Sequence, residues 1–462
     1  MTARHFLLFL AVLASTAATQ TATAGTDPER PNIIVIVSDD QGYADVGFNG
    51  SKQIPTPNID RIAKGGTIFS NGYVTYPVCG PSRAGLLTGR YQDRFGFGRN
   101  PTIDPTEPSA GLPVEEDQIS ELLKTVGYTN MAVGKWHMGI REEYHPLNQG
   151  YDRWFGFLSG GHRYFPEEYI YDSIEEVDTS WGWYKTRLQH NRERVDIDQY
   201  LTDELSDRAV EFVAEEHDGP FFLYLAYNAP HAPLQATEEY LERFQHIKNE
   251  KRRTYAAMVS AMDDGIGAVL DKLDERGLTD NTLVFFLSDN GGPEQKNASD
   301  NGPLREGKGS LYEGGIRVPF AVRWPARIPA NQIYESPIIS LDILGTIAAV
   351  TGIKTHSDRP LDGVNLLPYL RGENTGVPHD QLFWRKFDKD ERAVRQANVK
   401  LTMGIKDTGS QLFEVETDIG ETSDFARDNK DTVKMLEDAH RQWEAEMIDP
   451  AFPGLGTWRL ER

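Results

Sequence analysis

Apolar residues follow two alternating patterns along the first three quarters of the chain. Apolar runs of strand length occur at 31–37, 131–133, 221–225 and 283–287. Between them, apolar residues recur at helical spacing over 117–126, 205–213 and 258–273. Runs that are apolar at nearly every position are typical of strands buried on both faces, as in parallel sheets. The alternation predicts an α/β fold with a large, mostly parallel sheet flanked by helices on both faces.

The alternation stops in two places. Segment 160–184 is rich in aromatic and acidic residues and has no period, which predicts a surface insertion that shapes a cleft. Beyond residue 370, four short strand-like segments precede a helical one, at 382–384, 393–395, 399–401, 411–413 and 432–447. We therefore predict a main α/β domain over 28–370 and a smaller C-terminal α+β subdomain over 371–462.

The first residues have the features of an export signal. A charged start is followed by a short apolar run from Phe6 to Ala14 and by small residues that end in Ala22-Thr23-Ala24. We expect a signal peptide over 1–24, cleaved after Ala24, and a periplasmic or secreted protein. The apolar run is too short to cross a bilayer, and no later run is long enough, so no membrane span is expected.

The chain is strongly acidic. Its 462 residues include 48 Lys and Arg and 70 Asp and Glu, which gives a formal net charge of −22. Nucleic acid is therefore excluded as a partner, because phosphate binding needs a basic face. An anionic substrate would be repelled at long range, so a site for one requires a local cluster of cations.

The chain has one cysteine, Cys79, in the run from Val78 to Arg90. It cannot form an internal disulfide, so it is an inert core thiol, a reactive thiol or a residue that is modified. Pro81 and Gly89 are placed as at the start and end of a helix, which puts Cys79 at a helix N-terminus. Backbone N–H groups and the helix dipole make such an end a natural place for an anion.

Two predicted strands end in nearly the same way. One runs into Ser38-Asp39-Asp40 and the other into Ser288-Asp289-Asn290. Because ligands of open α/β sheets bind beyond the carboxyl ends of the strands, both ends can face one site. Three carboxylates and an amide oxygen together suit a hard cation such as Ca2+ or Mg2+. The alternative, that each Asp only starts a turn, explains one strand end better than a matched pair.

Basic residues follow other strand ends. Lys135 and His137 lie two apart in an extended segment, so both can enter one cleft. His231 lies in a loop bracketed by prolines, and Lys308 lies between glycines ahead of a Leu-Tyr-Glu-Gly-Gly-Ile-Arg-Val-Pro run. Taken singly, such residues are usually structural or solvated. The cluster that an anionic substrate requires would consist of Arg83, Lys135, His137, His231 and Lys308.

The order Cys79-x-Pro-Ser-Arg83 resembles the signature of formylglycine-dependent sulfatases. With the other motifs, from Asn32 to Pro319, the chain resembles a type I sulfatase of the alkaline phosphatase superfamily. The resemblance implies an alkaline-phosphatase-like fold, sulfate ester hydrolysis, and oxidation of Cys79 to formylglycine by a maturation enzyme. It also implies a calcium ion bound by residue 79 and by four strand-end residues, Asp39, Asp40, Asp289 and Asn290.

The same resemblance implies a role for each cationic residue. Lys135 and Lys308 would hold the sulfate oxygens, and Arg83 would hold the hydrated aldehyde. His231 would donate a proton to the departing oxygen, and His137 would deprotonate the second hydroxyl of residue 79.

The insertion suggests the substrate. Trp181, Trp183 and Tyr184 offer platforms for sugar rings, and His162 and Arg163 are candidate contacts to a neighbouring sulfate; ordinary packing is the alternative. We expect a sulfated polysaccharide or oligosaccharide of galactan or glycosaminoglycan type. The competing functions are a phosphate or phosphonate ester hydrolase of the same superfamily and a non-catalytic protein that binds sulfated carbohydrate with an unmodified cysteine.

Overall fold

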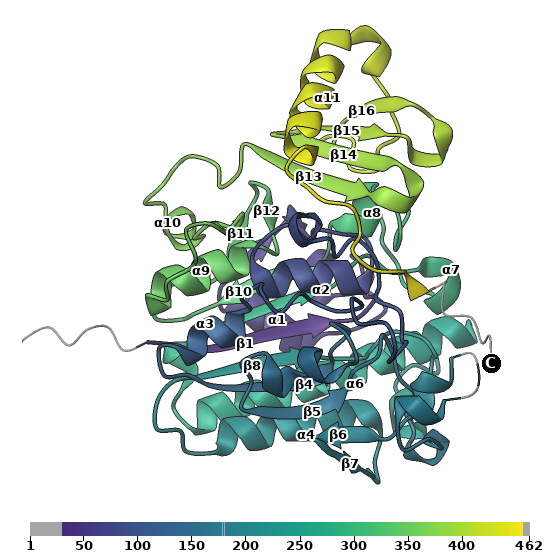
Figure 1. The fold of residues 1–462 in the computed structure, drawn as a ribbon, viewed down its shortest axis with the longest axis vertical. Helices are drawn as coiled ribbons and strands as arrows, with labels where there is room; N and C mark the ends of the chain where they lie inside the picture. The colour runs from purple at the N-terminus through teal and green to yellow at the C-terminus, as the bar shows by residue number, and fades with distance from the viewer. Residues whose placement is uncertain (1–29, 178, 180, 456–462) are drawn as a thin grey trace, which may run out of the picture.

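A large mixed sheet forms the centre of the computed structural model, which describes residues 30–177, 179 and 181–455 (Figure 1). Ten strands of the described residues form it in the order β11-β2-β10-β9-β1-β8-β4-β5-β6-β7. Their bounds are β1 Asn32–Ser38, β2 Thr67–Phe69, β4 Thr129–Lys135, β5 Arg153–Phe157, β6 Leu188–His190, β7 Glu193–Val195, β8 Phe221–Ala226, β9 Thr282–Ser288, β10 Phe320–Arg323 and β11 Gln332–Tyr334. The predicted signal peptide lies outside the described residues.

The centre of the sheet is parallel. Strands β9, β1, β8, β4 and β5 pair in parallel, whereas β10 pairs antiparallel with both β9 and β2. Every residue of β1, β8 and β9 is buried. Their apolar runs have no alternation because both faces are covered, and the predicted fold class is confirmed.

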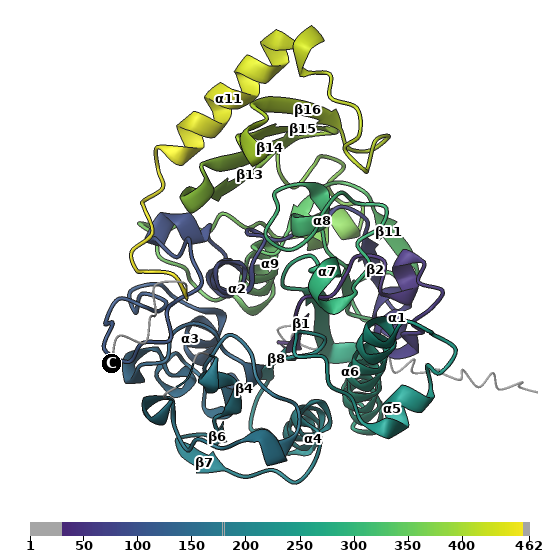
Figure 2. The same ribbon diagram turned by 90° about the vertical axis from the view of Figure 1, so that its right-hand side faces the viewer.

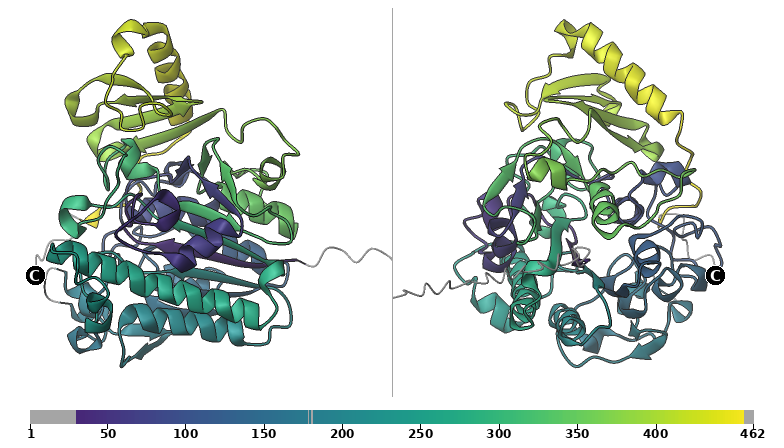
Figure 3. Two further views of the ribbon diagram at one scale, coloured as in Figure 1. Left: turned by 180° about the vertical axis from the view of Figure 1, so that it is seen from behind. Right: turned by 90° about the vertical axis from the view of Figure 1, so that its left-hand side faces the viewer.

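Helices cover both faces of the sheet. On one side lie α2 (Cys79–Thr88), α3 (Ile119–Lys124) and α9 (Asp342–Thr351), and on the other α1 (Pro57–Lys64), α4 (Leu201–Ala214) and α6 (Glu250–Glu275) (Figure 2). Alternate residues of β1 serve the two layers: Val35 packs with the first group and Ile36 with the second. The view from behind shows α6 running along its face of the sheet (Figure 3).

A smaller antiparallel sheet follows in the C-terminal part. It consists of β13 (Gln381–Lys386), β14 (Glu391–Gln396), β15 (Val399–Met403) and β16 (Ser410–Glu414), with α11 (Lys430–Glu444) packed on it. This agrees with the predicted α+β organisation, while the exact boundary near residue 370 stays a prediction. A two-stranded sheet of β3 (Gly72–Tyr73) and β12 (Ile338–Ile339) is also present.

The remaining α-helices of the described residues are short. They are α5 (Glu238–Glu242), α7 (Glu294–Asn297), α8 (Glu313–Ile316) and α10 (Leu367–Leu370). The described residues of the insertion and its end form short 3-10 turns at Pro166–Glu168, Ile174–Glu176 and Gly182–Lys185. Among the described residues, every helix is too short or too polar to traverse a bilayer.

Candidate active site

The carboxyl ends of four neighbouring strands, β9, β1, β8 and β4, converge on one site. These strand ends and the loops after them carry the residues singled out in the sequence, Asp39, Asp40, Lys135, His137, His231, Asp289 and Asn290. The register of β1 and β9 sets Ser38 opposite Ser288, so the two acidic ends lie side by side. The Asp289 amide donates to the Ser38 carbonyl at 3.0 Å, and the Asp40 amide donates to the Asp289 carboxylate at 3.2 Å.

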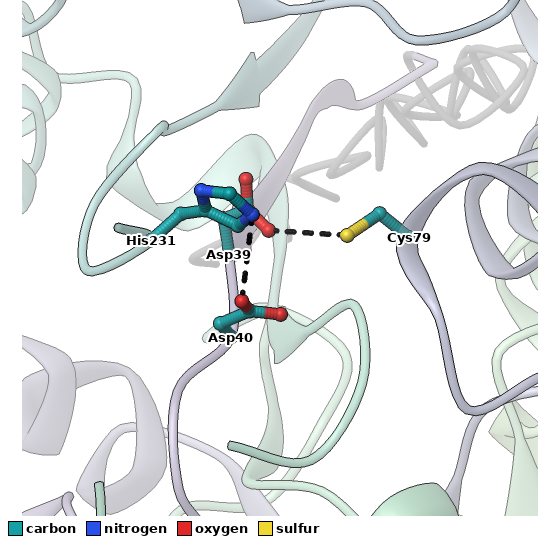
Figure 4. A group of neighbouring side chains, drawn as sticks. All are labelled: Asp39, Asp40, Cys79 and His231. Carbon is teal, nitrogen blue, oxygen red and sulfur yellow. Dashed lines mark hydrogen bonds and ion pairs between the residues drawn. The ribbon is translucent and has the colours of Figure 1, made fainter. Parts of the chain in front are cut away.

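Four of the side chains form a compact group that could hold a metal ion. One ligand atom each from Asp39, Asp40, Cys79 and His231 lies within 4.8 Å of the others (Figure 4). Asn290 extends this group, because its Nδ2 donates to Asp40 Oδ1 at 2.7 Å. Its Oδ1 is buried and has no hydrogen-bond partner among the described residues. An unsatisfied amide oxygen beside two carboxylates fits the oxygen-rich coordination of a hard cation.

Cationic side chains offset the buried carboxylates. Lys135 Nζ lies 2.6 Å from Asp39, and Arg83 lies 2.9 Å from Asp289. Burial alone would raise the pKa of Asp39, but the Lys135 ammonium and the other cations hold it well below its ordinary value. Burial, followed by the Asp39 charge, raises the pKa of Asp289 to about 6.

Cys79 lies at the first position of α2, as its sequence context predicts. Its Sγ is 3.5 Å from Asp39 Oδ1 and accepts a hydrogen bond from Lys308 Nζ at 3.2 Å. Burial, followed by the Asp289 charge, raises the pKa of the thiol to about 12. The unmodified thiol is therefore protonated near neutral pH and is a poor nucleophile, because the thiolate is the reactive form.

Two histidines and a lysine complete the inner site. His137 is buried with a backbone φ of 63°, and in the part of the chain that the structure describes both ring nitrogens lack hydrogen-bond partners. His231 Nδ1 is 2.6 Å from the Ala232 carbonyl and therefore carries a proton; its Nε2 faces Asp40 at 3.5 Å. Lys308 Nζ lies 2.6 Å from Asp40 Oδ1. Burial, followed by the charges of Lys135 and Arg83, lowers the pKa of His137, so its neutral ring can accept a proton.

A cavity of about 440 Å3 opens above this group. Insertion residues that line it are Gly160, Arg163, Trp181, Trp183 and Tyr184. His162 is placed differently from our expectation: it is fully buried behind the wall, and its ring nitrogens contact the backbone carbonyls of Arg163 and Thr186. Both nitrogens are engaged in packing the insertion, so His162 offers no contact to a ligand in the cavity.

Two residues of the proline-bracketed His231 loop, Ala232 and Pro233, also line the cavity. The lining residues outside the motifs are Asn100, Pro293, Lys296 and Leu455. Asn100 accepts a hydrogen bond from the Gly80 amide at 2.8 Å, which ties it to the start of α2. These four gave no sequence signal, because distant segments meet here through the fold alone.

Comparison with known proteins identifies the group to which this site belongs. The sequence pattern of the family described as Sulfatase matches residues 31–353. N-acetylgalactosamine-6-sulfatase of Mus musculus is 37% identical over 368 residues, which cover 76% of this chain and 68% of the mouse protein. The chain belongs to the sulfatase family. The Homo sapiens protein of the same name is 38% identical over 360 residues, 74% of this sulfatase and 66% of the human protein.

Solved structures agree with this assignment. The crystal structure of Ps i-CgsB in complex with k-i-k-neocarrahexaose is 42% identical, with a TM-score of 0.86 over 92% of the sulfatase and 95% of that chain. The phosphonate monoester hydrolase of Agrobacterium radiobacter is 18% identical, with a TM-score of 0.62 over 90% of this chain and 95% of its own. The second likeness concerns the fold alone.

Proposed function

We propose that this sulfatase is an exported enzyme that hydrolyses sulfate esters of a sulfated carbohydrate, of galactan or glycosaminoglycan type. In the proposal, a maturation enzyme converts Cys79 to formylglycine, and calcium is held by residue 79 with Asp39, Asp40, Asp289 and Asn290. The setting of Cys79 carries it: a protonated, buried thiol lies between Lys308 and Asp39, where an unmodified cysteine is unsuited to attack.

The carbohydrate part of the proposal is supported by relatives and by the cavity wall. The mammalian relatives are named for N-acetylgalactosamine-6-sulfate, and the solved neighbour is bound to a neocarrahexaose. In this chain, Trp181 and Trp183 have ring centroids 5.2 Å apart and both line the cavity. Trp181 is 57% exposed, so its ring is available to stack on a sugar.

Two absent groups would supply part of the chemistry. When bound, calcium would polarise the sulfate ester, and hydrated formylglycine would supply the attacking oxygen. The chain's own residues bind and orient the ester. Lys135 and Lys308 provide ammonium groups for the sulfate oxygens, and Arg83 is fixed by the Asp289 carboxylate and the Lys135 carbonyl.

We assign proton transfer to two histidines, His231 and His137. His231 lines the cavity and directs its Nδ1–H at the Ala232 carbonyl. We therefore assign the proton donated to the departing carbohydrate oxygen to Nε2 of the doubly protonated ring, which the Asp39 and Asp40 carboxylates stabilise. His137 lies on the same cavity wall with a neutral ring, and we assign it the proton released from residue 79 when sulfate leaves. The two rings therefore serve opposite stages of one reaction.

Mass spectrometry of natively expressed, active protein tests the modification. We expect the Cys79 peptide to carry an aldehyde in place of the thiol. Cys79→Ser should fail to turn over repeatedly, because a serine provides only one hydroxyl. Persistent thiol in fully active protein, or normal multiple turnover by the serine variant, would contradict the proposal.

Sulfate release from defined substrates tests the activity. Sulfated galactan and glycosaminoglycan oligosaccharides are compared with phosphate and phosphonate monoesters of an aryl alcohol. We expect release from at least one sulfated carbohydrate and weaker hydrolysis of the phosphorus esters; the reverse preference would favour a phosphate or phosphonate hydrolase. Exported protein should begin at Gly25 when its N-terminus is sequenced.

A further inference from the structure

A second cavity, of about 390 Å3, adjoins the active-site cavity. Its walls come from the strand-end segment that includes α7, from the loop around Lys308 and from the C-terminal part; the lining residues with charged or hydroxyl side chains are Glu294, Lys296, Glu306, Lys308, Ser310, Glu391 and Lys406. The two cavities share Pro293, Lys296 and Lys308. Lys308, which contacts Cys79, is thus part of a wall common to both.

The second cavity differs in character from the first. None of the described residues that line it is aromatic, whereas Trp181, Trp183 and Tyr184 line the active-site cavity. Its volume is in the range of ligand sites, about 300–1,000 Å3, and its polar lining suits a hydroxylated, charged ligand. Glycines at 307 and 309 flank Lys308, so little side-chain bulk separates the two spaces.

The charges along this wall single out Lys296. Lys308 pairs with Asp40, and Lys406 pairs with Glu306. Lys296 is exposed and forms no ion pair within the described part of the chain. An unpaired ammonium that faces both cavities, in a chain of net charge −22, is suited to an acidic group of a bound ligand.

We propose that the second cavity is a sugar-binding subsite for the residue next to the one that loses sulfate, and that Lys296 binds an acidic substituent of that neighbouring sugar. The substrate then lies across Lys308, with one sugar against the aromatic wall and the next against α7 and the C-terminal part. Sulfate in the interior of a chain is consequently accepted. This inference rests on the proposed action on sulfated carbohydrate.

The test compares two substrates on the same variants. One is a sulfated monosaccharide and the other a multiply sulfated oligosaccharide that contains the same sugar internally. We expect Lys296→Gln to lower kcat/KM for the oligosaccharide by about tenfold, the loss of one charge-assisted contact, and to leave the monosaccharide within about twofold. Lys406→Gln, which alters only the second cavity, should also lower kcat/KM for the oligosaccharide. Lys296→Arg should retain most of the oligosaccharide activity.

Lys64→Gln is the matched control, because Lys64 is an exposed lysine of α1 outside both cavities. This variant should leave kcat/KM unchanged for both substrates. An equal loss on both substrates with Lys296→Gln, or no loss on either, would overturn the subsite. If the wild-type protein releases sulfate from neither carbohydrate, the proposed function itself fails; if it desulfates both and the ratio is unchanged in the variants, only the subsite fails.

Discussion

Replacing Lys400 with methionine should strongly destabilise the sulfatase, although Lys400 is in the C-terminal sheet. Its side chain is fully buried in β15, with the ammonium 2.8 Å from Glu313 and 3.0 Å from Glu421. Glu313 begins α8, so this cluster joins the C-terminal sheet to the motif that follows Lys308. Lys400→Met keeps the unbranched apolar part of the side chain and removes its charged end.

The loss of stability depends on the buried carboxylates that remain when the Lys400 charge is removed. Removing one partner of a buried ion pair costs about 3–5 kcal/mol, because the other charge stays uncompensated. Two features reduce the cost here. Tyr73 donates to Glu313 at 2.6 Å, and burial raises the pKa of Glu421 to about 7, so one carboxyl is partly protonated near neutrality. We therefore expect a loss of about 3 kcal/mol at pH 8 and a smaller one at pH 5.

Urea unfolding followed by tryptophan fluorescence measures this loss. Trp384 lies against Tyr73 with ring centroids 5.3 Å apart, so its emission reports on this part of the molecule. Lys434→Met is the matched control, because Lys434 is 75% exposed and 3.8 Å from Asp438; its effect should stay below about 1 kcal/mol. Equal unfolding free energies for the two variants would refute the reasoning.

Three further outcomes are expected. The folded-state pKa of Glu421, about 7, exceeds its ordinary value, so the stabilisation from its protonated form is complete below pH 4.5 and is lost as the pH rises through 7. Glu421→Gln should therefore remove up to about 3 kcal/mol of the pH dependence of the unfolding free energy. An unchanged dependence of the unfolding free energy on pH would contradict this. Gly160→Ala would set a Cβ 2.6 Å from His137 Nε2, so kcat for sulfate release should fall at least about tenfold, and an unchanged kcat would show that the ring is not held there. A chelator should abolish turnover and added calcium restore it; full activity after exhaustive chelation would exclude an essential metal.

The sequence predicts best the elements that are buried on both sides. Strands β1, β8 and β9 were visible as apolar runs because each lies between two helical layers. The paired ends after Ser38 and Ser288 were readable for the same reason: parallel neighbours in register must place their following residues side by side. The parallel pairing of the two strands was therefore enough to predict that these two distant motifs meet in one site.

Other parts of the structure could not be predicted from the sequence, because contacts with distant residues determine their conformation. The edge strand β7 and its neighbour β6 have three residues each, too few to show a period. His162 was expected at the cavity, but the non-periodic insertion turns its ring toward the carbonyl of Thr186 instead. The cluster of Lys400 and Glu313 joins residues 87 positions apart, and neither residue type at those positions suggests a buried partner.

The balance of charge explains why an anion site contains so many acids. Asp39, Asp40 and Asp289 face three cations, Arg83, Lys135 and Lys308, and the group is close to neutral by itself. A sulfate ester adds negative charge, which neutral surroundings in an acidic protein would not favour. A bound divalent cation would take up charge on Asp40 and release Lys308 from its 2.6 Å pair toward the ester. On this reasoning substrate affinity depends on the metal, so the chelated protein should bind a sulfated oligosaccharide more weakly than the calcium-loaded protein in a direct binding measurement, and equal affinities would show that Lys308 is not redirected.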